Sequence, residues 1–397
     1  MKTMASEYRI EVHDRPSAIP AQAWNSLLEA QPAPTPFMRH EYLTALHDSG
    51  SACPQTGWAP CYLTAWRGDE LAGACAAYLK SHSYGEYVFD WAWADAHHRH
   101  GLAYYPKLLV AVPFTPVPGT RLLARSHEDR RSLAEALGTL AREQGLSSAH
   151  LLFLDEVDRQ ALGEAGWTMR EGVQFHWEQD RAAPVSDFAA LLSRLRRDKR
   201  KKIQQERRRV AEAGVSFEVR EGSGIGAQDW DFFHRCYTLT YQAHGSTPYL
   251  TRDFFARTAD SMPQHWLMFV ARQGDEPVAC SLLAIDRTRL AAWGRYWGCT
   301  RDIPGLHFEA CYYQPLQWCL GQGFTRLEGG AQGEHKMARG LLPVATWSAH
   351  WLRDPRFAEA VSAFTRRERA GVDGYLDDLR ERNPFKAAGQ PQGDAQP

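Results

Sequence analysis

Residues that could move protons gather in the stretch GGAQGEHKMARG, residues 329–340, directly after the short apolar segment that ends at Glu328. Acylating an amine requires a base that takes its proton and a group that stabilises the oxyanion. A carboxylate or imidazole suits the first task, and a lysine or backbone N–H groups suit the second. The candidate catalytic residues are Glu328, Glu334, His335 and Lys336, with Gln332 as a candidate substrate-binding residue. The alternative is a glycine turn with solvated charges; the Walker pattern G-x-x-x-x-G-K-[ST] is not matched.

A second polar group lies in YLKSHSYGEYVFDWAWADAHHRHGLAYYPKL, residues 78–108. Strand alternation over residues 86–93 predicts Glu86 and Asp90 on one face and Trp91 with other rings on the opposite face. Two carboxylates beside aromatic rings could bind an amine-bearing acceptor. The candidate substrate-binding residues are Lys80, His82, Tyr84, Glu86, Asp90, Trp91, Tyr105 and Lys107. The alternative is a core strand whose polar groups are satisfied by hydrogen bonds. We predict no metal site, because the neighbouring histidines of this stretch diverge on a loop.

The stretch RDIPGLHFEACYY, residues 301–313, leads into a predicted helix. A helix N-terminus offers unpaired N–H groups to an anion, so this loop could hold the phosphates of an acyl donor. The candidate phosphate-binding residues are Ile303, Gly305, Leu306 and Phe308. His307 and Glu309 could line the acceptor cleft instead. The alternative for Glu309 is a structural one, because a carboxylate is favoured in the first turn of any helix.

The chain has a net charge of −1, but residues 194–209 hold ten lysines and arginines against two acids. Such a surface could neutralise several phosphates, with an affinity that falls steeply with salt. The alternative is a solvated helix face. The candidate nucleic-acid-binding residues are Arg196, Arg197, Lys199, Arg200, Lys201, Lys202, Arg207 and Arg208. Apolar residues spaced i, i+3, i+4 and i+7 from Phe188 predict one long helix over residues 187–212, capped by Ser186 and ended by Gly214.

Two parts of the chain resemble each other. Residues 62–79 and 267–285 each read as an apolar strand, a Gly-Asp-Glu turn and a second apolar strand. Each hairpin is followed by a Trp-rich segment predicted as a strand, then a Gly-Leu loop and a Tyr-Tyr pair. The repeat predicts two domains of the same fold, at residues 1–181 and 182–386, followed by a disordered tail at 387–397.

The remaining elements follow from periodicity and turn residues. Helices are predicted at 128–145, 157–164 and 308–320, and strands at 149–154, 167–178, 324–328 and 344–352. This succession predicts an α/β (α+β) fold, a mixed sheet with helices on both faces.

Composition narrows the class of protein. Apolar residues make up 44% and charged residues 23% of the 397 residues, as in globular domains. The N-terminus lacks the apolar region of a secretory signal, and no apolar run approaches the ~20 residues of a transmembrane segment. The eight cysteines form no CxxC pair, so we expect reduced thiols and a cytoplasmic protein.

Several parts of the chain resemble a known family. They are the hairpin repeat, the basic segment LRRDKRKKIQQERRRVAEAGV, and the stretches KSHSYGEYVFDWAWADA, YYPKLLVAVPFTPVPGTRLL, IPGLHFEACYYQP and GGAQGEHKMARGLLP. They are similar to the FemAB-like N-acyltransferases, a Fem-type branch of the GNAT superfamily linked to peptidoglycan biosynthesis or recognition. The resemblance covers roughly residues 35–385. Of the GNAT pyrophosphate signature Gln/Arg-x-x-Gly-x-Gly/Ala, only Gly305 is present.

The resemblance implies two tandem GNAT-like domains, with the basic helix between or projecting from them. It also implies transfer of an acyl or aminoacyl group from acyl-CoA or aminoacyl-tRNA to an amine of a small molecule, peptide or cell-wall precursor, by direct attack. The donor is then a co-substrate, and no cofactor is permanently bound. Two alternatives stay open: a non-catalytic module that binds nucleic acid or a cell-wall precursor, and a tRNA-dependent aminoacyl ligase of specialised metabolism. The sequence leaves the oligomeric state open.

Overall fold

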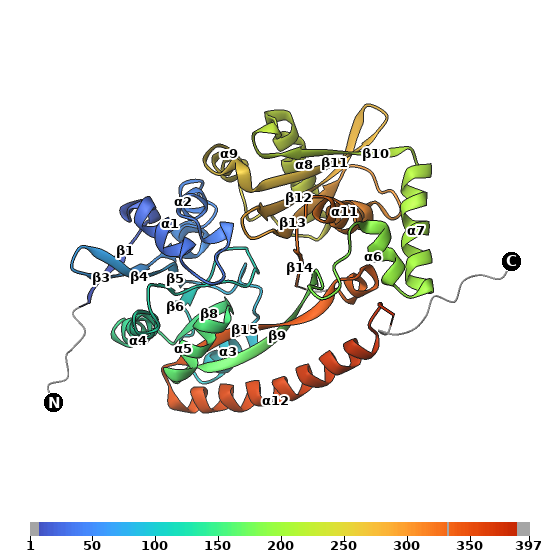
Figure 1. Ribbon diagram of the computed structural model, residues 1–397. Helices are drawn as coiled ribbons and strands as arrows, with labels where there is room; N and C mark the ends of the chain where they lie inside the picture. Colours follow the sequence, from blue (N-terminus) through green and yellow to red (C-terminus); the bar gives the residue numbers. More distant parts are fainter. Residues whose placement is uncertain (1–7, 332, 387–397) are drawn as a thin grey trace. The chain divides into compact units, whose positions relative to one another are not determined.

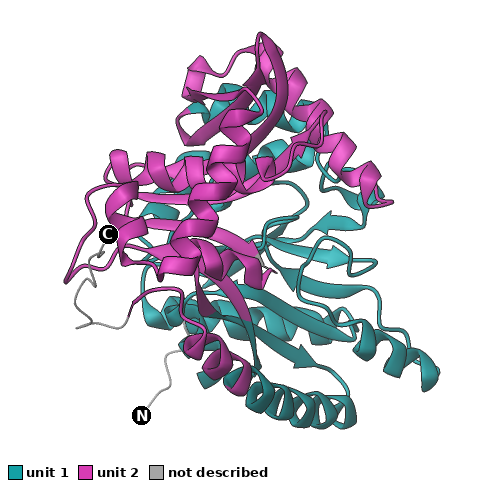
Figure 2. Cartoon of the chain, turned by 90° about the vertical axis from the view of Figure 1, so that its right-hand side faces the viewer, with its two compact units in different colours: residues 1–172, 248–263, 345–373 teal, residues 173–247, 264–344, 374–397 magenta. Residues whose placement is uncertain are grey.

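The computed structural model describes residues 8–331 and 333–386. The chain divides into two compact units, coloured teal and magenta in Figure 2. Unit 1 takes residues 1–172, 248–263 and 345–373, and unit 2 takes residues 173–247, 264–344 and 374–397. The division therefore differs from the predicted contiguous ranges 1–181 and 182–386, since two later segments return to unit 1. The predicted tail, 387–397, and Gln332 lie outside the described residues.

Unit 1 contains two groups of hydrogen-bonded strands. The first group has the order β1-β3-β4-β7 and includes the predicted hairpin, which is formed by β3 and β4. The second group has the order β2-β5-β6-β8-β15, and in it β6 and β8 are parallel. The strands are β1 (Arg9–His13), β2 (Trp58–Pro60), β3 (Tyr62–Arg67), β4 (Glu70–Cys75), β5 (Ala77–Lys80), β6 (Lys107–Val110), β7 (Leu123–Ala124), β8 (Ser148–Leu154) and the unit 1 part of β15 (Leu342–Leu352). Apolar residues of β3, β6 and β8 pack against α4 and α5 in one core.

The helices of unit 1 flank these strands (Figure 1). They are α1 (Ala21–Glu29), α2 (His40–Asp48), α3 (Trp91–Arg99), α4 (His127–Glu143), α5 (Glu156–Glu164), α9 (Arg252–Ser261) and the first part of α12 (Pro355–Glu381). Ser126 and Asp155 cap α4 and α5 through hydrogen bonds to backbone N–H groups. Helix α3 packs on α12 through Trp93 and Val361.

Unit 2 has the strand order β10-β11-β12-β13-β14-β9. The strands are β9 (Thr168–Glu178), β10 (Val215–Glu221), β11 (Trp266–Gln273), β12 (Glu276–Asp286), β13 (Ala291–Cys299) and β14 (Arg326–Ala331). The helices are α6 (Phe188–Arg194), α7 (Arg197–Glu212), α8 (Ala227–Ala243), α10 (Leu306–Phe308) and α11 (Gln314–Gly321), together with the π-helix η6 (Glu309–Tyr313) and the 3₁₀ helix η7 (Glu334–Arg339). Trp266 of β11 contacts Trp230 of α8, whereas its neighbour Leu267 packs in the cluster with α6 and α11. Successive residues point to opposite faces, so helices cover both faces of this sheet, as predicted.

The prediction of one continuous helix over residues 187–212 is wrong, because the structure has two helices there, α6 and α7. Leu195 and Arg196 are extended, with ψ of 151° and 148°. Their backbone groups pair with the C-terminal segment, because Arg196 N donates to Pro384 O at 2.8 Å and Leu195 pairs with Phe385. The cap of α6 is Asp187, which accepts from Ala190 N, and not the predicted Ser186.

The predicted strand over residues 86–93 is also wrong. A loop runs to Asp90, and α3 begins at Trp91. Gly85 and Tyr87 have φ of 79° and 62°, a left-handed conformation that interrupts any strand. A Cβ at Gly85 would lie 2.5 Å from the Phe114 ring, so only glycine fits there. The corresponding Trp-rich segment of unit 2 is a strand, β13, as predicted.

Most other predicted elements are confirmed within a few residues, including α4, β8, α5, β9, β14 and β15. The predicted helix over 308–320 is divided into α10, η6 and α11. Within residues 8–331 and 333–386, no helix combines the length and apolar composition needed to cross a bilayer.

Candidate functional site

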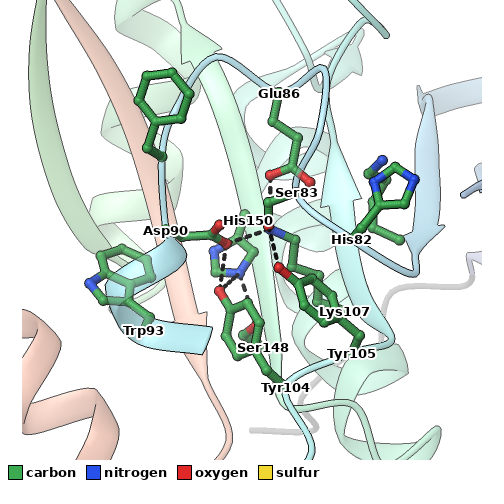
Figure 3. A network of polar contacts seen from close by, with 12 residues as sticks. His82, Ser83, Glu86, Asp90, Trp93, Tyr104, Tyr105, Lys107, Ser148 and His150 are labelled. Carbon is green, nitrogen blue, oxygen red and sulfur yellow. Dashed lines mark hydrogen bonds and ion pairs between the residues drawn. The ribbon is translucent and has the colours of Figure 1, made fainter. Parts of the chain in front are cut away.

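Lys107, at the start of β6, is the centre of a buried polar network in unit 1 (Figure 3). Its ammonium is 0% exposed and donates to Ser83 Oγ and Glu86 Oε2, both at 2.8 Å, and to Asp90 Oδ2. Glu86 and Asp90 are 3% and 4% exposed. The loop between β5 and α3 thus brings two carboxylates to one lysine.

Burial and charge set the pKa values of this group. Burial opposes the charge on Lys107, but Glu86 and Asp90 outweigh it, so the lysine pKa is raised. Burial would raise the pKa of Asp90, yet Lys107 holds it down at about 2. For Glu86 burial prevails and raises the pKa to about 7. Asp90 is therefore an anion at neutral pH, and Glu86 is close to its own midpoint.

A hydrogen-bonded relay leads from Asp90 through the core of unit 1. Tyr104 Oη donates to Asp90 Oδ2 at 2.6 Å and lies 3.1 Å from His150 Nε2. His150 Nδ1 lies 2.8 Å from His350 Nδ1, and His350 Nε2 lies 2.9 Å from Ser348 Oγ. Burial lowers the pKa of His150 to about 3 and that of His350 well below its usual value, so both rings are neutral.

Two serines also belong to this relay. His150 Nε2 lies 2.8 Å from Ser148 Oγ as well as 3.1 Å from Tyr104 Oη. Ser348 Oγ, next to His350, donates to the Arg170 carbonyl oxygen at 3.5 Å. The two imidazoles are therefore fixed by hydrogen bonds on both ring nitrogens, in a buried group that ends at Asp90.

Lys80 lies beside this group without joining its ion pairs. Its Nζ is 3.7 Å from the centre of the Trp58 ring and 3.4 Å from the Tyr84 carbonyl oxygen. Burial lowers its pKa to about 7. A fully buried amine with one long hydrogen bond is therefore partly uncharged at neutral pH.

Aromatic side chains border the network at the surface. Tyr84 is 58% and Trp91 41% exposed, and their ring centres lie 5.1 Å apart. His82 contacts Tyr84, and Tyr105 Oη lies 2.8 Å from Ser83 Oγ. The structure thus gathers the eight residues predicted from this stretch in one part of unit 1; their binding role stays a prediction.

Unit 2 contains a pocket of about 170 Å³ where β13 and β14 separate. The two parallel strands pair only from Ala291 with Arg326 to Trp293 with Glu328. Each of the two strands also has a register shift with its other neighbour. The pairing of β12 with β13 shifts between Leu282 and Leu283, and the pairing of β14 with β9 shifts between Glu328 and Ala331. Such irregularities often occur beside active sites, where they redirect side chains. The pocket is lined by Ser281, Leu282, Leu283, Gly294, Arg295, Tyr296, Trp297, His307, Cys311, Tyr312 and Gly329.

His307 brings an uncharged imidazole to this pocket. Burial lowers its pKa to about 4, and its ring packs against Trp297 with the centres 5.0 Å apart. Tyr312 Oη lies 3.2 Å from His335 Nε2, and burial lowers the pKa of His335 as well. The pocket therefore has a proton acceptor on one wall and a phenol–imidazole pair beside it.

Lys336 supports β14 from behind the pocket. It is buried and donates to the Gly330 carbonyl oxygen at 3.2 Å. Burial lowers its pKa to about 8. A Cβ at Gly329 would lie 3.3 Å from Lys336 Cδ and 2.5 Å from Leu341, so glycine lets the lysine approach the strand.

Residues 15–387 match the FemAB-like family, described as peptidoglycan biosynthesis/recognition. The chain belongs to the FemAB-like family. No curated protein matches it in sequence.

Three solved structures are similar to this FemAB-like chain, each at 11% identity. L-PGS from Bacillus licheniformis has a TM-score of 0.55, with 89% of this chain and 98% of that chain covered. FemX has a TM-score of 0.53, with 87% and 98% covered. The C-terminal domain of a putative lysylphosphatidylglycerol synthetase from Agrobacterium fabrum has a TM-score of 0.51, with 86% and 94% covered. These similarities establish the fold, and the fold class expected from the Fem-type resemblance is confirmed.

None of the four predicted catalytic residues of the FemAB-like protein belongs to the pocket lining, and two of them, Glu328 and Glu334, have other partners. Glu328 is buried in an ion pair with Arg326 at 2.9 Å and lies 3.7 Å from His176. Glu334 is exposed and accepts from Tyr375 at 3.0 Å. These contacts give both carboxylates partners in the fold, and their catalytic role stays a prediction that the geometry does not favour.

The predicted phosphate loop packs against α7. Leu306 N donates to the Ile303 carbonyl oxygen at 3.0 Å, and the Leu306 side chain is buried beside Val210. Gly305 faces the backbone of Glu206, and Phe308 lies under the Arg339 guanidinium at 3.4 Å. Since these groups already have contacts in the fold, phosphate binding stays a prediction that the geometry does not favour.

Arg207 and Glu309 also join elements of unit 2. Arg207 Nε donates to Glu309 Oε1 at 3.1 Å, and its guanidinium lies over Phe188. This pair fixes α7 to η6, so Arg207 does not belong to an open basic face and Glu309 does not line the pocket. The other predicted nucleic-acid-binding residues differ in exposure: Arg196, Arg197, Lys201, Lys202 and Arg208 are exposed, and Lys199 and Arg200 are half-buried.

Sequence reasoning missed the residues that extend both sites. His150 and His350 come from apolar strands, and Tyr312 was read only as part of a Tyr-Tyr pair. A histidine inside an otherwise apolar strand was the available signal for the relay, because a buried imidazole needs partners. Within the described part of the chain, no group of three His, Cys, Asp or Glu side chains could hold a metal ion.

Proposed function

We propose that this FemAB-like protein transfers an acyl or aminoacyl group from acyl-CoA or aminoacyl-tRNA to an amine, and that the reaction takes place in the unit 2 pocket. The observation that carries this proposal is the uncharged His307 imidazole in the pocket where β13 and β14 separate. The family description favours an acceptor connected with peptidoglycan, such as an amine of a cell-wall precursor or peptide.

The acceptor nitrogen attacks the acyl carbon directly. A C–N bond forms, and the C–S bond of a thioester or the C–O bond of an aminoacyl ester breaks. His307 accepts the proton that the nitrogen loses and returns it to the leaving sulfur or oxygen. The products are an amide and either free CoA or deacylated tRNA, without a covalent enzyme intermediate.

Tyr312, His335 and Lys336 prepare the pocket for this step. The Tyr312–His335 hydrogen bond fixes the phenol on the wall that carries His307. Lys336 holds the Gly330 carbonyl and places positive charge behind Gly329, where an oxyanion would be stabilised. Apolar residues of β12 exclude water from the acyl group.

Donor consumption tests the proposal. Purified protein is incubated with acetyl-CoA or charged tRNA and amine acceptors, and CoA release and tRNA deacylation are measured separately. We expect one donor to be consumed, with His307→Gln slower by about 10²- to 10⁴-fold and His244→Gln, a change at an exposed histidine of unit 2, without effect. If neither donor is consumed, the transferase proposal fails; ligand binding without turnover would favour the binding module.

The basic face of α7 distinguishes the donors. Lys201, Lys202 and Arg208 are exposed, and they could contact phosphates of a tRNA. Reversing these three charges should abolish tRNA deacylation and reduce the salt dependence of tRNA binding. The same change should leave CoA release from acetyl-CoA unaffected. Equal loss of both activities would contradict a tRNA role for this face.

A further inference from the structure

We infer that Arg339 is a positioning residue for the proposed reaction, because it joins α7 to the backbone of His335 beside the unit 2 pocket. The inference rests on the proposed function for the reaction that the residue serves. It deepens that function by assigning the part of the fold that sets the position of the Tyr312–His335 pair. Arg339 is not among the described residues that line the pocket, so it acts through its neighbours.

The Arg339 side chain bridges two elements of unit 2. Its Nη1 donates to the His335 carbonyl oxygen at 2.6 Å, and its Nη2 donates to both carboxylate oxygens of Glu206 on α7 at 3.0 Å. The guanidinium carbon lies 3.4 Å from the centre of the Phe308 ring. Because the residue is only 3% exposed, these contacts hold its charged group in one orientation.

Glu206 is itself fixed by the packing of α7. Ile203 and Val210, three positions before it and four positions after it, are buried in unit 2. This spacing places Glu206 on the same side of the helix as the two apolar side chains. The buried Tyr313 also donates its hydroxyl hydrogen to Glu206. Helix α7 therefore presents a fixed carboxylate to η7, and Arg339 carries that position to the His335 backbone.

His335 connects this ion pair to the pocket wall. Its Nε2 lies 3.2 Å from the hydroxyl oxygen of Tyr312, which lines the pocket together with His307. Gly333 has φ of 102°, and a Cβ there would lie 2.4 Å from Cε1 of the His335 ring, so only glycine leaves room for this ring. The His335 side chain is exposed. Arg339 thus fixes the backbone of a residue whose imidazole a substrate can reach.

The geometry of these contacts calls for a guanidinium. One carbonyl oxygen and two carboxylate oxygens receive hydrogen bonds from two nitrogens of a single planar group that lies over an aromatic ring. A lysine ammonium carries the same charge but lacks the planar fork. The change Arg339→Lys therefore separates the geometric role of this residue from its charge.

The charge of Arg339 also acts on the two imidazoles beside it. Burial is the largest cause that lowers the pKa of His335, and the Arg339 charge lowers it further. For His307 burial again comes first, and His335 and Arg339 contribute to its pKa of about 4. A fixed cation disfavours a protonated imidazole nearby. Arg339 thus helps to keep both rings uncharged, as a proton acceptor must be.

Steady-state kinetics and NMR titration of the full-length protein test the inference. Arg339→Gln should lower kcat by about ten- to a hundredfold and leave the KM of the acceptor unchanged, because positioning is lost while substrate contacts remain. The imidazole signal of His335, assigned by comparison with His335→Asn, should titrate about half a pH unit or more above its wild-type value. Arg339→Lys should keep the wild-type pKa of His335 and recover only part of kcat. The matched control is Arg287→Gln, which breaks an exposed ion pair with Glu221 of unit 2 and should change neither value.

A double variant keeps the test decisive if Arg339→Gln does not fold, since removing one partner of a buried ion pair leaves the other charge unpaired. Glu206→Gln combined with Arg339→Gln replaces the ion pair by two uncharged amides. It should show the same loss of kcat and a smaller rise in the pKa of His335, because the carboxylate charge is removed as well.

Three results overturn the inference: folded variants that keep the wild-type kcat, a fall in kcat for Arg339→Gln without any change in the His335 titration, or complete recovery of kcat by Arg339→Lys. The last result would leave a charge effect without a positioning role. A wild-type protein that consumes neither donor rejects the proposed function instead. In that case the NMR titration alone decides whether Arg339 governs His335.

Discussion

At the scale of single residues, burial more than direct contact sets the charges of the candidate groups. His307, His150 and His350 are uncharged because burial disfavours their protonated forms. Lys80 and Lys336 have pKa values near 7 and 8 for the same reason. Unit 1 and unit 2 thus each hold side chains that can exchange protons near neutral pH.

The first prediction concerns the pH dependence of catalysis. His307 is uncharged above its pKa of about 4, so its contribution to kcat/KM should be constant from pH 5 upwards and be lost near pH 4. His307→Gln should lower kcat/KM by about 10²- to 10⁴-fold and remove this acid limb. The measurement is a kcat/KM profile corrected for ionisation of the acceptor amine. An acid limb unchanged in the variant would contradict a role for His307 as proton acceptor.

The second prediction concerns stability. The pKa values of His150 and His350 are lowered in the folded state, so the unfolded chain binds more protons below its histidine pKa of ~6.5. Their contribution is present above pH 6.5 and is lost as the pH falls through this value, for His150 down to about pH 3, by up to ~1.4 kcal/mol per pH unit and histidine. His350→Asn should therefore flatten the loss of unfolding free energy between pH 6.5 and 5 in urea titrations. His98→Asn, an exposed histidine of α3, should keep the wild-type slope.

At the scale of elements, the pairing of residues 384–386 with the gap between α6 and α7 explains why the basic segment is not one helix. Arg196 N and Arg194 O bond to this segment and are unavailable to a continuous helix. Phe385 packs beside the unit 2 core. A segment near the end of the chain therefore determines where α7 begins.

The third prediction follows from this contact. Phe385→Ala should lower the free energy of unfolding by about 1–3 kcal/mol, because the ring is partly buried against the core. Urea unfolding monitored by tryptophan fluorescence measures the change. Phe364→Ala, an exposed phenylalanine of α12, should change stability by less than about 0.5 kcal/mol. Equal effects of the two variants would show that the 384–386 pairing does not support unit 2.

Periodicity and turn residues were sufficient for the helices and strands that lie between glycines, such as α4, β8 and β12. They failed where long-range contacts decide: Asp90 ends a loop because Lys107 holds its carboxylate, and Leu195 is extended because Phe385 pairs with it. The candidate residues of unit 1 were found from their density in one stretch. His150 and His350 were missed because partners 200 positions apart leave no local pattern.

At the scale of the whole molecule, the two units interleave along the sequence. Unit 1 needs residues 248–263 for α9 and residues 345–373 for its part of β15 and for the start of α12. His350, the second ring of the relay, is in the last of these segments. The relay therefore joins residues that lie 200 positions apart in the sequence.

The fourth prediction is that the fragments 1–181 and 182–397 do not fold separately. The first fragment lacks β15, which pairs with β8 on the edge opposite β6, and the second lacks residues 173–178 of β9, which pair with β14. Circular dichroism and urea titration of each fragment should show no cooperative transition, whereas mixing the two should restore one. A cooperative transition in either fragment alone would contradict this dependence.

The interleaved chain also has a consequence for synthesis on the ribosome. Unit 1 begins with the first strands of the chain. However, the edge of β8 that pairs with β15 has no partner strand until residues 345–352 have left the exit tunnel. Buried polar groups such as His150 are without their final partner during that interval. Nascent chains of this protein should therefore depend on chaperones for most of translation, in contrast to proteins whose domains are completed one after the other.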